Sequence, residues 1–434
     1  MAEQPYDEYC REIFNPNKHF EKTEALDDLK VLDITNYILG PEIPQYLALF
    51  GAEVIKVEWP AGDAFRNLGP HGPHQTVKTL DGKSSTGLVY LDHATNKHHI
   101  ALDLHSEKAR EIIKGLVAKV DVVVENFRPG TLDKLGIGYR QLKEINPRLI
   151  YVWAGGWGQW GQYKDRPSYD PVGQCASGMV AITSNKMGGD PTKAGYWLCD
   201  HVGAYHGVIG VMMALWNRQK TGEGQMIEVC QNEAGMRLLD YRFMEAAMLQ
   251  GDHEPLAEGN WEFCAAPYGF VHCKDGLLWI GMAAWRLFTD VMKTIGKTHL
   301  IEELGLKTAF DLSEMKVQER IYAEIEEVTM QKTVEEAEKF FIEAGIPTSR
   351  IFTPWDCIND PNYIERKTLY DFDCPHYGKL KVTQPHPRLS KTPGRVKWVA
   401  QPIGHETFEI LEKYLGYTKK DVEELVEKKI SVIK

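Results

Sequence analysis

The chain has 434 residues, of which 43% are apolar and 26% are charged, and its formal net charge is −11. One hydrophobic core rarely supports this length, so two domains are expected. The acidic balance argues against a general electrostatic grip on nucleic acid or on an anionic membrane, and neither is expected as a partner. The eight cysteines are scattered singly, which indicates reduced thiols in a cytoplasmic protein.

Residues 1–27 form a polar extension of mixed charge, to which no role is assigned. The first regular elements predict a β–α–β unit, with strands at 29–35 and 52–58 around a helix at 43–50. This unit lacks the G-x-G-x-x-G fingerprint, so NAD is not expected although the pattern is typical of a doubly wound sheet. A long loop then runs to about residue 87, and such loops are usually functional or mobile.

A second unit of the same kind follows. Its apolar spacing predicts a helix at 105–120 and a buried strand at 121–126, and a further helix and strand lead to a glycine-rich turn at 155–161. Loops at the carboxyl ends of parallel strands meet at one edge of the sheet, where ligands bind. The fold class is therefore α/β, with a Rossmann-like large domain built on a parallel sheet.

The most informative stretch surrounds Asp200. An apolar strand at 196–199 is expected to pass there into a helix, which is punctuated by glycines at 203, 207 and 210. A carboxylate at that junction lies near a helix N-terminus, whose backbone N–H groups favour negative charge. On this pattern alone Asp200 is either a helix cap or a nucleophile. Cys199, which precedes it, is expected to lie in the core.

The rest of the chain sets the domain boundaries. A strand at 222–229 closes the large domain, which spans 28–230, and one long helix within 231–254 is a plausible linker. Hairpin signals around the turn at 274–276, followed by helices, indicate a small α+β domain at 255–350. Residues 351–434 are expected to return to the large domain, ending in a charged helical stretch.

Several side chains in these loops suit a phosphorylated ligand. No metal is expected, because the histidines lack carboxylates at ligand spacing. Basic residues recur after successive strands, where they could jointly hold a polyphosphate, although each alone is usually a surface charge. The candidates are Arg66, Lys97, Arg128, Lys134 and Arg166, with Tyr37, Trp59 and Phe127 as aromatic partners for a base.

Four stretches together resemble the class III CoA-transferases, the family of formyl-CoA transferase and carnitine CoA-transferase. They are LDITNYILGPEIPQYLALFGAEVIKVEWPAGD, ENFRPGTLDKLGIGYRQLKEINPRLIY, KDRPSYDPVGQCASGM and RQKTGEGQMIEV. The likeness covers nearly the whole chain from residue 29. It implies a Rossmann-like domain made from both chain ends, an inserted small domain, and two protomers interlinked like chain rings.

The resemblance also implies residue roles. Asp200 matches the family's nucleophile, and Asn126, Phe127 and Lys134 match residues that contact CoA. Arg66, Lys97 and Arg128 are further CoA candidates by charge, and Tyr37 and Ile38 occupy the family's turn ahead of Gly-Pro. Gly259 and Asn260 resemble the family's mobile loop over the active site. The implied reaction moves CoA from an acyl-CoA such as succinyl-CoA to a carboxylic acid, through mixed anhydrides and an aspartyl-CoA thioester.

Two alternatives remain open. The related α-methylacyl-CoA racemases have a histidine where this chain has Tyr169, and a tyrosine, with an ordinary pKa of about 10, is a poor base for an α-proton. The transferase is therefore favoured. The chain could also be one subunit of a pair of unlike chains. Trp59 in place of a basic residue, together with 11 tryptophans, favours a bulky aromatic or alicyclic acid, as in benzylsuccinate-type transferases.

Overall fold

The structure is a computed structural model that describes residues 4–67, 76–82, 85–249, 257, 259–262, 264–281 and 284–433. The chain divides into two compact units. The first comprises Met1–Ser177, Ala194–Leu238 and Pro361–Lys434, and the second Gly178–Lys193 and Leu239–Asp360. The second unit is thus an insertion in the first. The sequence did not indicate that Gly178–Lys193 would lie with it.

The described part of the first unit is built on a six-stranded parallel sheet in the order β5-β2-β1-β6-β7-β8. Its four inner strands are almost wholly buried, which explains why most of their residues are apolar. The six strands are β1 (Lys30–Ile34), β2 (Glu53–Glu58), β5 (Lys97–Ala101), β6 (Val122–Glu125), β7 (Ile150–Gly155) and β8 (Met226–Cys230).

The strand order reverses between β1 and β6. From β1 the chain moves outward through β2 to β5, then crosses back to β6 on the other side of β1. The loops after β1 and β6 therefore leave the sheet in opposite directions. A crevice opens at such a switch point, and ligands of open α/β sheets bind there.

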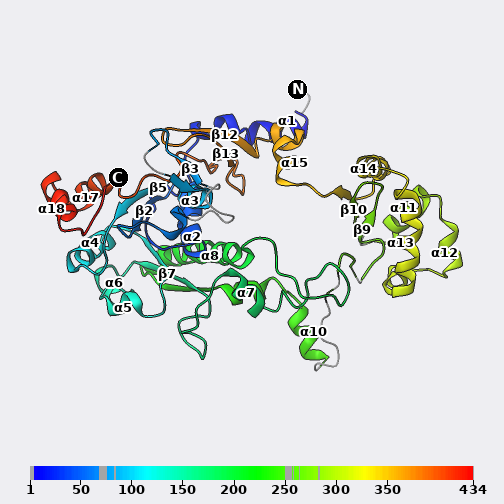
Figure 1. The fold of residues 1–434 in the computed structure, drawn as a ribbon, viewed down its shortest axis with the longest axis horizontal. Helices are drawn as coiled ribbons and strands as arrows, with labels where there is room; N and C mark the ends of the chain where they lie inside the picture. The colour runs from blue at the N-terminus through cyan, green and yellow to red at the C-terminus, as the bar shows by residue number, and fades with distance from the viewer. Residues whose placement is uncertain are drawn as a thin grey trace. The chain divides into compact units, whose positions relative to one another are not determined.

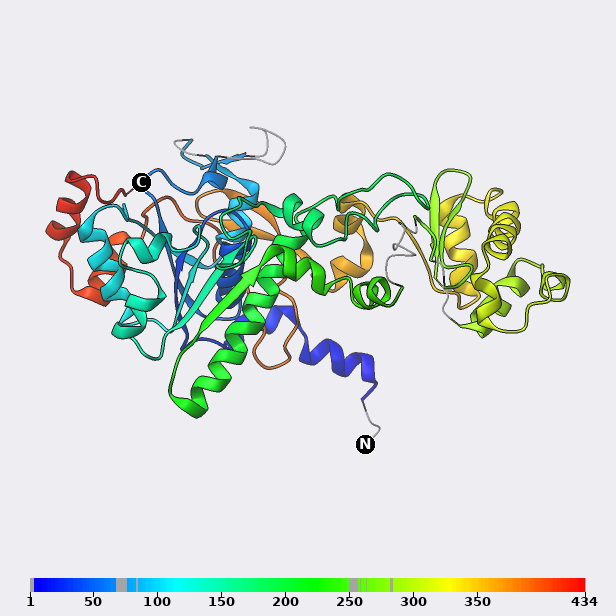
Figure 2. The ribbon, with the colours of Figure 1, turned by 90° about the horizontal axis from the view of Figure 1, so that it is seen from below.

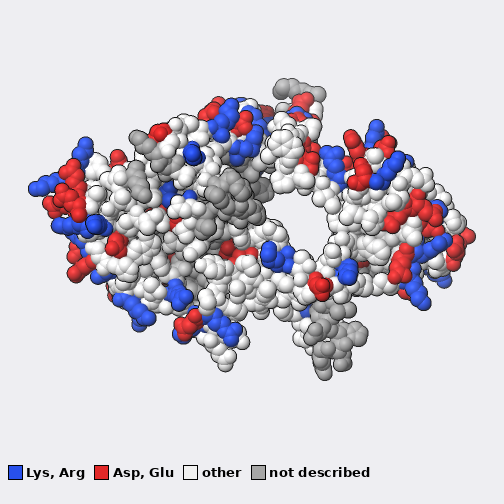
Figure 3. Space-filling view, viewed as in Figure 1, with Lys and Arg blue, Asp and Glu red and all other residues white. Residues whose placement is uncertain are grey.

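Helices cover both faces of the sheet (Figures 1 and 2). One core is formed with α2 (Leu39–Leu49) and α8 (Leu198–Thr221). The core on the other face includes α4 (Glu107–Val117), α17 (Thr407–Leu415) and α18 (Lys419–Glu427). On the face shown in Figure 3, basic side chains are interspersed with acidic ones over α17 and α18.

Shorter elements complete the first unit. The hairpins are β3 (Thr76–Lys78) with β4 (Ser85–Gly87), and β12 (Leu369–Cys374) with β13 (Gly378–Thr383). The remaining helices are α1 (Tyr6–Ile13), α3 (Leu88–His93), α5 (Thr131–Lys134), α6 (Tyr139–Ile145), α7 (Asp170–Ala176), α9 (Gln231–Arg237) and α16 (Pro361–Glu365).

The second unit has an antiparallel sheet in the order β11-β10-β9, with a turn at 274–276 between β9 and β10 as predicted. Its strands are β9 (Gly269–His272), β10 (Leu277–Ile280) and β11 (Thr348–Arg350). Its helices are α10 (Arg242–Met248), α11 (Trp285–Thr294), α12 (His299–Glu303), α13 (Met315–Thr329), α14 (Val334–Glu343) and α15 (Pro354–Asn359).

Two predicted elements differ from the structure. Residues 196–199 are not a strand, because α8 already begins at Leu198. The long helix expected within 231–254 is two helices, α9 and α10, separated where Asp240 adopts a left-handed backbone with φ of 51°. A left-handed residue cannot continue a right-handed helix.

Helix α8 is the longest of the described helices, and by length and apolar composition alone it could cross a membrane. In the structure it packs against α2. A Cβ added at Gly203 would lie 2.6 Å from Leu39 Cδ1, and one at Gly207 would lie 2.5 Å from Ile43 Cδ1. The glycines therefore allow α8 and α2 to pack closely. The side of α8 that bears these glycines is apolar because it packs in the core.

The chain returns to the first unit to cover the sheet edge at β5. The backbone N–H of His99 donates to Glu406 Oε2 at 2.8 Å, and the Ser431 hydroxyl donates to the Ala101 carbonyl at 2.7 Å. Covering an edge strand in this way satisfies backbone groups that could otherwise pair with another chain.

Candidate active site

A cavity of about 210 Å³ lies in the first unit at the switch point of the sheet. Its walls come from the loops that follow β1, β6 and β7 and from the first turns of α8 and α9. The lining includes Tyr37, Ile38, Asn126, Phe127, Arg128, Gly155, Gly156, Arg166, Ser168, Tyr169, Asp200 and Gln231. The structure thus brings together eight of the predicted site residues.

Asp200 is the third residue of α8 and is only 7% exposed. Its Oδ1 accepts a hydrogen bond of 2.6 Å from Gln231 Nε2. Burial raises the pKa of Asp200 to about 7, with a smaller contribution from the charge of Asp170, while the bond from Gln231 opposes the rise. The carboxyl is therefore held partly protonated near neutral pH by its low-polarity surroundings.

The helix cap of α8 is Asp170, not Asp200. Trp197, the residue before the helix, provides no side-chain cap. Instead Asp170 Oδ1 accepts from the backbone N–H groups of Cys199 (2.7 Å) and Asp200 (3.1 Å). The carboxylate of Asp200 is consequently free of capping and directed to Gln231. Cys199 is fully buried, as predicted.

Gln231 links Asp200 to a second loop. Its Oε1 accepts a hydrogen bond of 2.6 Å from Ser168 Oγ, while its Nε2 donates to Asp200. Gly156 makes room for this contact, because a Cβ there would lie 2.1 Å from Ser168 Cβ. Sequence reasoning missed Gln231 and Asp170. The only signal for Asp170 was its place after Tyr169 in the stretch quoted for the family resemblance.

Asn126 and Tyr37 shape the opposite wall. The Asn126 side chain accepts from the Asn36 N–H (2.8 Å) and donates to the Asn36 carbonyl (2.6 Å), so its amide holds the loop after β1. Tyr37 adopts a left-handed backbone, with φ of 68°, and its ring meets that of Tyr169 edge-on at 5.4 Å. The Tyr169 hydroxyl donates to the Tyr37 hydroxyl at 3.4 Å.

Positive charge reaches the cavity from two loops. Arg128 is exposed and lines the cavity, and the Arg166 guanidinium lies over the Tyr163 ring at 3.6 Å. Lys134 is exposed on α5, outside the lining. Arginine suits phosphate and carboxylate recognition, so anion binding at this rim is chemically reasonable.

The structure contradicts Arg66 and Lys97 as CoA contacts. Arg66 is 5% exposed, and its guanidinium donates two bonds to Glu58, at 2.7 and 2.6 Å. Lys97 is fully buried, and its ammonium donates to Asp33 and to the Pro41 carbonyl. Both predictions rested mainly on charge, and charge does not distinguish an interior ion pair from a surface cation.

Gly259 and Asn260 belong to the second unit. Gly259 has φ of 78°, and a Cβ there would lie 2.7 Å from Lys186 Cα, so only glycine fits. The Asn260 carbonyl accepts from the Phe270 N–H at 3.0 Å. A role for this segment over the cavity stays a prediction.

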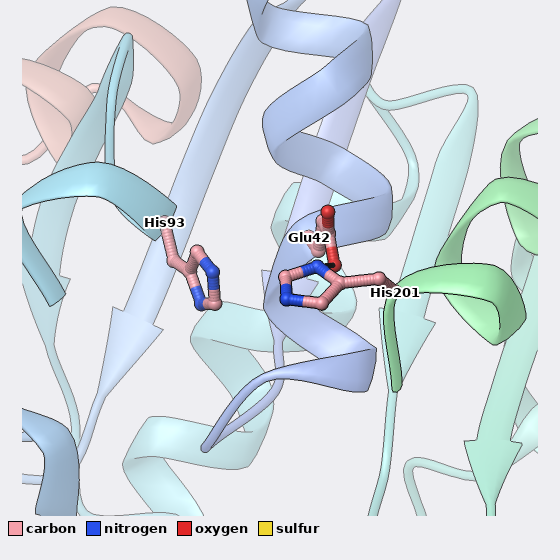
Figure 4. Close-up of side chains that lie close together, drawn as sticks. All are labelled: Glu42, His93 and His201. Carbon is pink, nitrogen blue, oxygen red and sulfur yellow. Dashed lines mark hydrogen bonds and ion pairs between the residues drawn. The ribbon is translucent and has the colours of Figure 1, made fainter. Parts of the chain in front are cut away.

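Glu42, His93 and His201 form a cluster, with donor atoms within 4.8 Å of one another, and His201 directly follows Asp200 in the sequence (Figure 4). By residue type these groups could hold a metal ion. However, His201 Nδ1 hydrogen-bonds to Glu42 Oε2 at 2.7 Å. Burial and the positive charges of His201 and Lys97 lower the pKa of His93 to about 3, so this imidazole is neutral. Glu42 and His201 form a hydrogen-bonded pair, whereas His93 Nδ1 is buried without a hydrogen-bond partner among the described residues.

Comparisons with known proteins point to one family. The family described as CoA-transferase family III matches residues 26–407. The chain is 32% identical over 411 residues to succinyl-CoA–D-citramalate CoA-transferase of Chloroflexus aurantiacus, covering 93% of this chain and 98% of that one. It is 30% identical over 414 residues to the alpha subunit of succinyl-CoA–L-malate CoA-transferase of the same organism, covering 93% and 92%.

A solved structure is also similar. The crystal structure of a CAIB/BAIF family protein from Brucella suis matches with a TM-score of 0.78 at 28% sequence identity. The match covers 91% of this chain and 100% of that one.

Proposed function

The chain belongs to CoA-transferase family III and is a class III CoA-transferase, and on that premise we propose that Asp200 is the nucleophile of its reaction. The observation that supports this role most directly is the placement of Asp200. It is a buried carboxylate in the wall of the cavity at the sheet's switch point, oriented by Gln231 and free of helix capping. A second buried carboxylate, Asp170, is committed to the cap.

The proposed chemistry proceeds through four acyl transfers. The Asp200 carboxylate attacks the donor thioester and expels CoA thiolate, which forms a mixed anhydride. The thiolate attacks the Asp200 carbonyl, releasing the donor acid and leaving an aspartyl-CoA thioester. The acceptor carboxylate attacks that thioester, giving a second anhydride and thiolate. The thiolate then attacks the acceptor carbonyl, which yields acceptor-CoA and restores Asp200.

Each tetrahedral oxyanion needs hydrogen-bond donors nearby. Gln231 Nε2, which bonds Asp200 Oδ1 in the free enzyme, is in place to follow that oxygen as negative charge builds on it. Asp170 fixes the first turn of α8, so the carboxylate does not have to be repositioned at each step. Preorganisation of this kind is usually the largest part of enzymatic acyl-transfer catalysis.

We assign CoA binding to the cavity wall formed by Tyr37, Ile38, Phe127 and Arg128. Asn126 shapes this wall through Asn36, while Lys134 lies on the adjoining exposed surface. Succinyl-CoA is the first donor to test, because two similar enzymes are named for it. The aromatic lining favours a bulky acceptor acid, so aromatic and alicyclic acids belong in the acceptor panel beside hydroxy-dicarboxylic acids.

We also propose that the enzyme is an interlinked homodimer. Support comes from α8, which exposes an apolar stripe on the side opposite its glycines. The stripe comprises Tyr205, Ile209, Met212, Met213 and Trp216, which are 41–66% exposed. Large exposed apolar patches usually mark an interface. Pairing with an unlike chain is the alternative, since one similar enzyme has alpha and beta subunits.

Trapping the intermediate tests the proposal. The protein is incubated with succinyl-CoA, treated with hydroxylamine or borohydride, and digested for peptide mass mapping. We expect a modification on Asp200 and loss of both adduct and turnover in Asp200→Asn. An active enzyme with no adduct at Asp200, and with full turnover in that variant, would rule out the proposed nucleophile.

A racemase would give a different result. It would exchange the α-proton of a 2-methylacyl-CoA with deuterium from the solvent without any acceptor acid. Solvent exchange without CoA transfer would therefore replace the transferase assignment.

A further inference from the structure

A charged cluster lies beneath the loop that forms one wall of the cavity. Asp33, Lys56 and Lys97, from β1, β2 and β5, are each at most 1% exposed. Lys97 Nζ lies 2.9 Å from Asp33 Oδ2, and Lys56 Nζ lies 3.4 Å from Asp33 Oδ1. Burying three charges is costly unless each is paired and hydrogen-bonded, so a cluster like this calls for an explanation.

Both lysines bind the backbone of residues 35–41, which comprise the loop after β1 and the start of α2. The Lys56 ammonium donates to the Thr35 carbonyl at 2.5 Å, and the Lys97 ammonium donates to the Pro41 carbonyl at 2.6 Å. Asp33 completes the set by accepting from the Thr35 N–H at 3.0 Å and from the Thr35 hydroxyl at 2.5 Å. The two ends of residues 35–41 are therefore tied to the interior of the sheet.

The loop itself is held in a conformation that needs such anchors. Tyr37 is left-handed, with φ of 68°, which costs free energy for a residue with a Cβ. A Cβ added at Gly40 would lie 2.8 Å from Asn126 Cγ and 2.8 Å from Thr35 Cβ, so the loop is tightly packed against its neighbours. Strain of this kind persists only where the surroundings over-determine the backbone.

We propose that Lys97 and Lys56 are positioning residues whose ammonium groups anchor the two ends of residues 35–41, and so hold Tyr37 and Ile38 in the wall against which the CoA thioester binds. The inference rests on the proposed function of the cavity. It gives Lys97 a role in substrate binding that acts through the loop, not through contact with CoA.

The surroundings of Lys97 make its charge sensitive to pH. Burial lowers its pKa to about 8, against the opposing effect of Asp33. The charged and titratable groups facing it are Asp33, Lys56 and Asp63, with Glu42 and His93 on the helices above. Above that pH the group becomes an amine, which loses its attraction to Asp33 and binds the Pro41 carbonyl more weakly.

The test compares steady-state kinetics of the full chain at about pH 7 and about pH 9.5. The variants are Lys97→Met, which removes the charge, and Lys97→Arg, which keeps it at both pH values. Lys413→Met is the matched control, because Lys413 pairs with Glu53 on the exposed side of the first unit. Melting temperature and Asp200 adduct formation are measured in parallel.

For the wild type we expect KM for the thioester to rise about tenfold between the two pH values while kcat changes less. Lys97→Met should show the high KM at both pH values, Lys97→Arg should show a KM that does not change with pH, and Lys413→Met should follow the wild type. A wild-type KM that is flat with pH, or a Lys97→Met KM equal to that of the control, would overturn the inference.

Two further measurements distinguish a failure of the proposed function from a failure of the proposed lysine anchor. If the wild type forms no Asp200 adduct, the proposed function fails independently of Lys97. If the Lys97 variants do not fold, hydrogen exchange of residues 35–41 in the wild type decides. After correction for the intrinsic rate, exchange should accelerate above about pH 8 only if the anchor titrates. Unchanged protection there would contradict the anchor.

Discussion

Asp200 is a far weaker acid than an exposed aspartate, because burial raises its pKa from an ordinary 3.8 to about 7. Only the ionised carboxylate is a nucleophile. We therefore expect kcat/KM to rise with pH through about 7. Above about pH 8 it should fall again as the proposed Lys97 anchor loses its charge. A pH–rate profile with succinyl-CoA measures this rise. An acidic limb centred near pH 4 would show that burial does not raise the pKa of the reacting carboxyl.

The same rise in pKa makes Asp200 destabilising to the folded state at neutral pH. Between pH 3.8 and about 7 the folded state keeps the proton that the unfolded state has lost, so this group's contribution to stability falls as pH rises through that window. Asp200→Asn should therefore be more stable than the wild type at about pH 8, by about 2–4 kcal/mol. Urea unfolding at about pH 8 and about pH 4 measures the difference, which should vanish at the lower pH.

The hydrogen bond from Gln231 is expected to lower the pKa of Asp200. Gln231→Glu replaces the donor to Asp200 with a second carboxylate, which should raise the pKa of Asp200 further. We expect kcat/KM at neutral pH to fall by about one to two orders of magnitude and the acidic limb to move to higher pH. Gln225→Glu, on an exposed residue of the same unit, should leave both unchanged. An unshifted limb in Gln231→Glu would argue against the role.

At the residue scale, the sequence indicates residues that lie in a recognisable motif. It does not reveal residues whose role depends on contacts with distant parts of the chain. Asp200 could be predicted because its glycine-punctuated helix and the family resemblance converge on one position. Asp170 and Gln231 could not, because each meets Asp200 only through the folding of segments about thirty residues away. Lys97 and Arg66 were misassigned because burial depends on the whole sheet.

At the scale of elements, the cap of α8 joins stability to function. Asp170 lies on α7 and accepts from two N–H groups of the first turn of α8, so its carboxylate fixes the turn that bears Asp200. Asp170→Ala should cost about 1–2 kcal/mol in unfolding free energy and lower kcat by about tenfold or more. Chemical unfolding and turnover are measured together.

Thr418→Ala is a matched control for the cap. Thr418 accepts from the Asp421 N–H at 3.3 Å and caps α18, on the face of the sheet opposite α8. This variant should lose about 1 kcal/mol and keep its activity. An Asp170→Ala enzyme as active as the Thr418 variant would show that the cap does not position the nucleophile.

Five of the six parallel strands could be predicted, because they are short apolar runs bounded by turn residues. The sixth, β5, was missed because Lys97, His98 and His99 make up more than half of it. Short apolar runs are ambiguous, which is why residues 196–199 suggested a strand where α8 begins at Leu198. The break between α9 and α10 depends on one left-handed residue, Asp240, which the helical periodicity of the stretch does not reveal.

At the scale of the whole molecule, α8 has two apolar sides. Its buried side includes Gly203, Gly207 and Val211, while Met213 and Trp216 on the other side are 66% and 63% exposed. The proposed homodimer would cover the second side. We expect the wild type to sediment as a dimer and Met213→Glu to weaken association by about tenfold or more.

Met330→Glu is the control for the dimer. Met330 is 51% exposed in the second unit, so the same change of charge is made outside the unit that contains α8. Its sedimentation should match the wild type. A wild-type protein that stays monomeric at all concentrations while turning over would remove the homodimer from the proposal.

The insertion of a small domain into the large one could be predicted, because hairpin and helix signals at 255–350 separate the parallel-strand pattern from the C-terminal part of the chain. The membership of Gly178–Lys193 could not, since this segment lies in the middle of the first unit's sequence yet contacts the second unit's later residues. An example is the Gly188 N–H, which donates to the Ala257 carbonyl at 3.0 Å.

The cover over β5 has a consequence for biosynthesis. Ala101 is hydrogen-bonded by Thr407 and Ser431, which are made more than 300 residues later. On the ribosome the outer edge of β5 must therefore stay uncovered until the inserted unit and nearly all of the remaining chain have emerged. The first unit therefore begins to fold first and is completed last. A nascent chain that is halted after the insertion exposes the unpaired edge of β5, to which chaperones would have to bind.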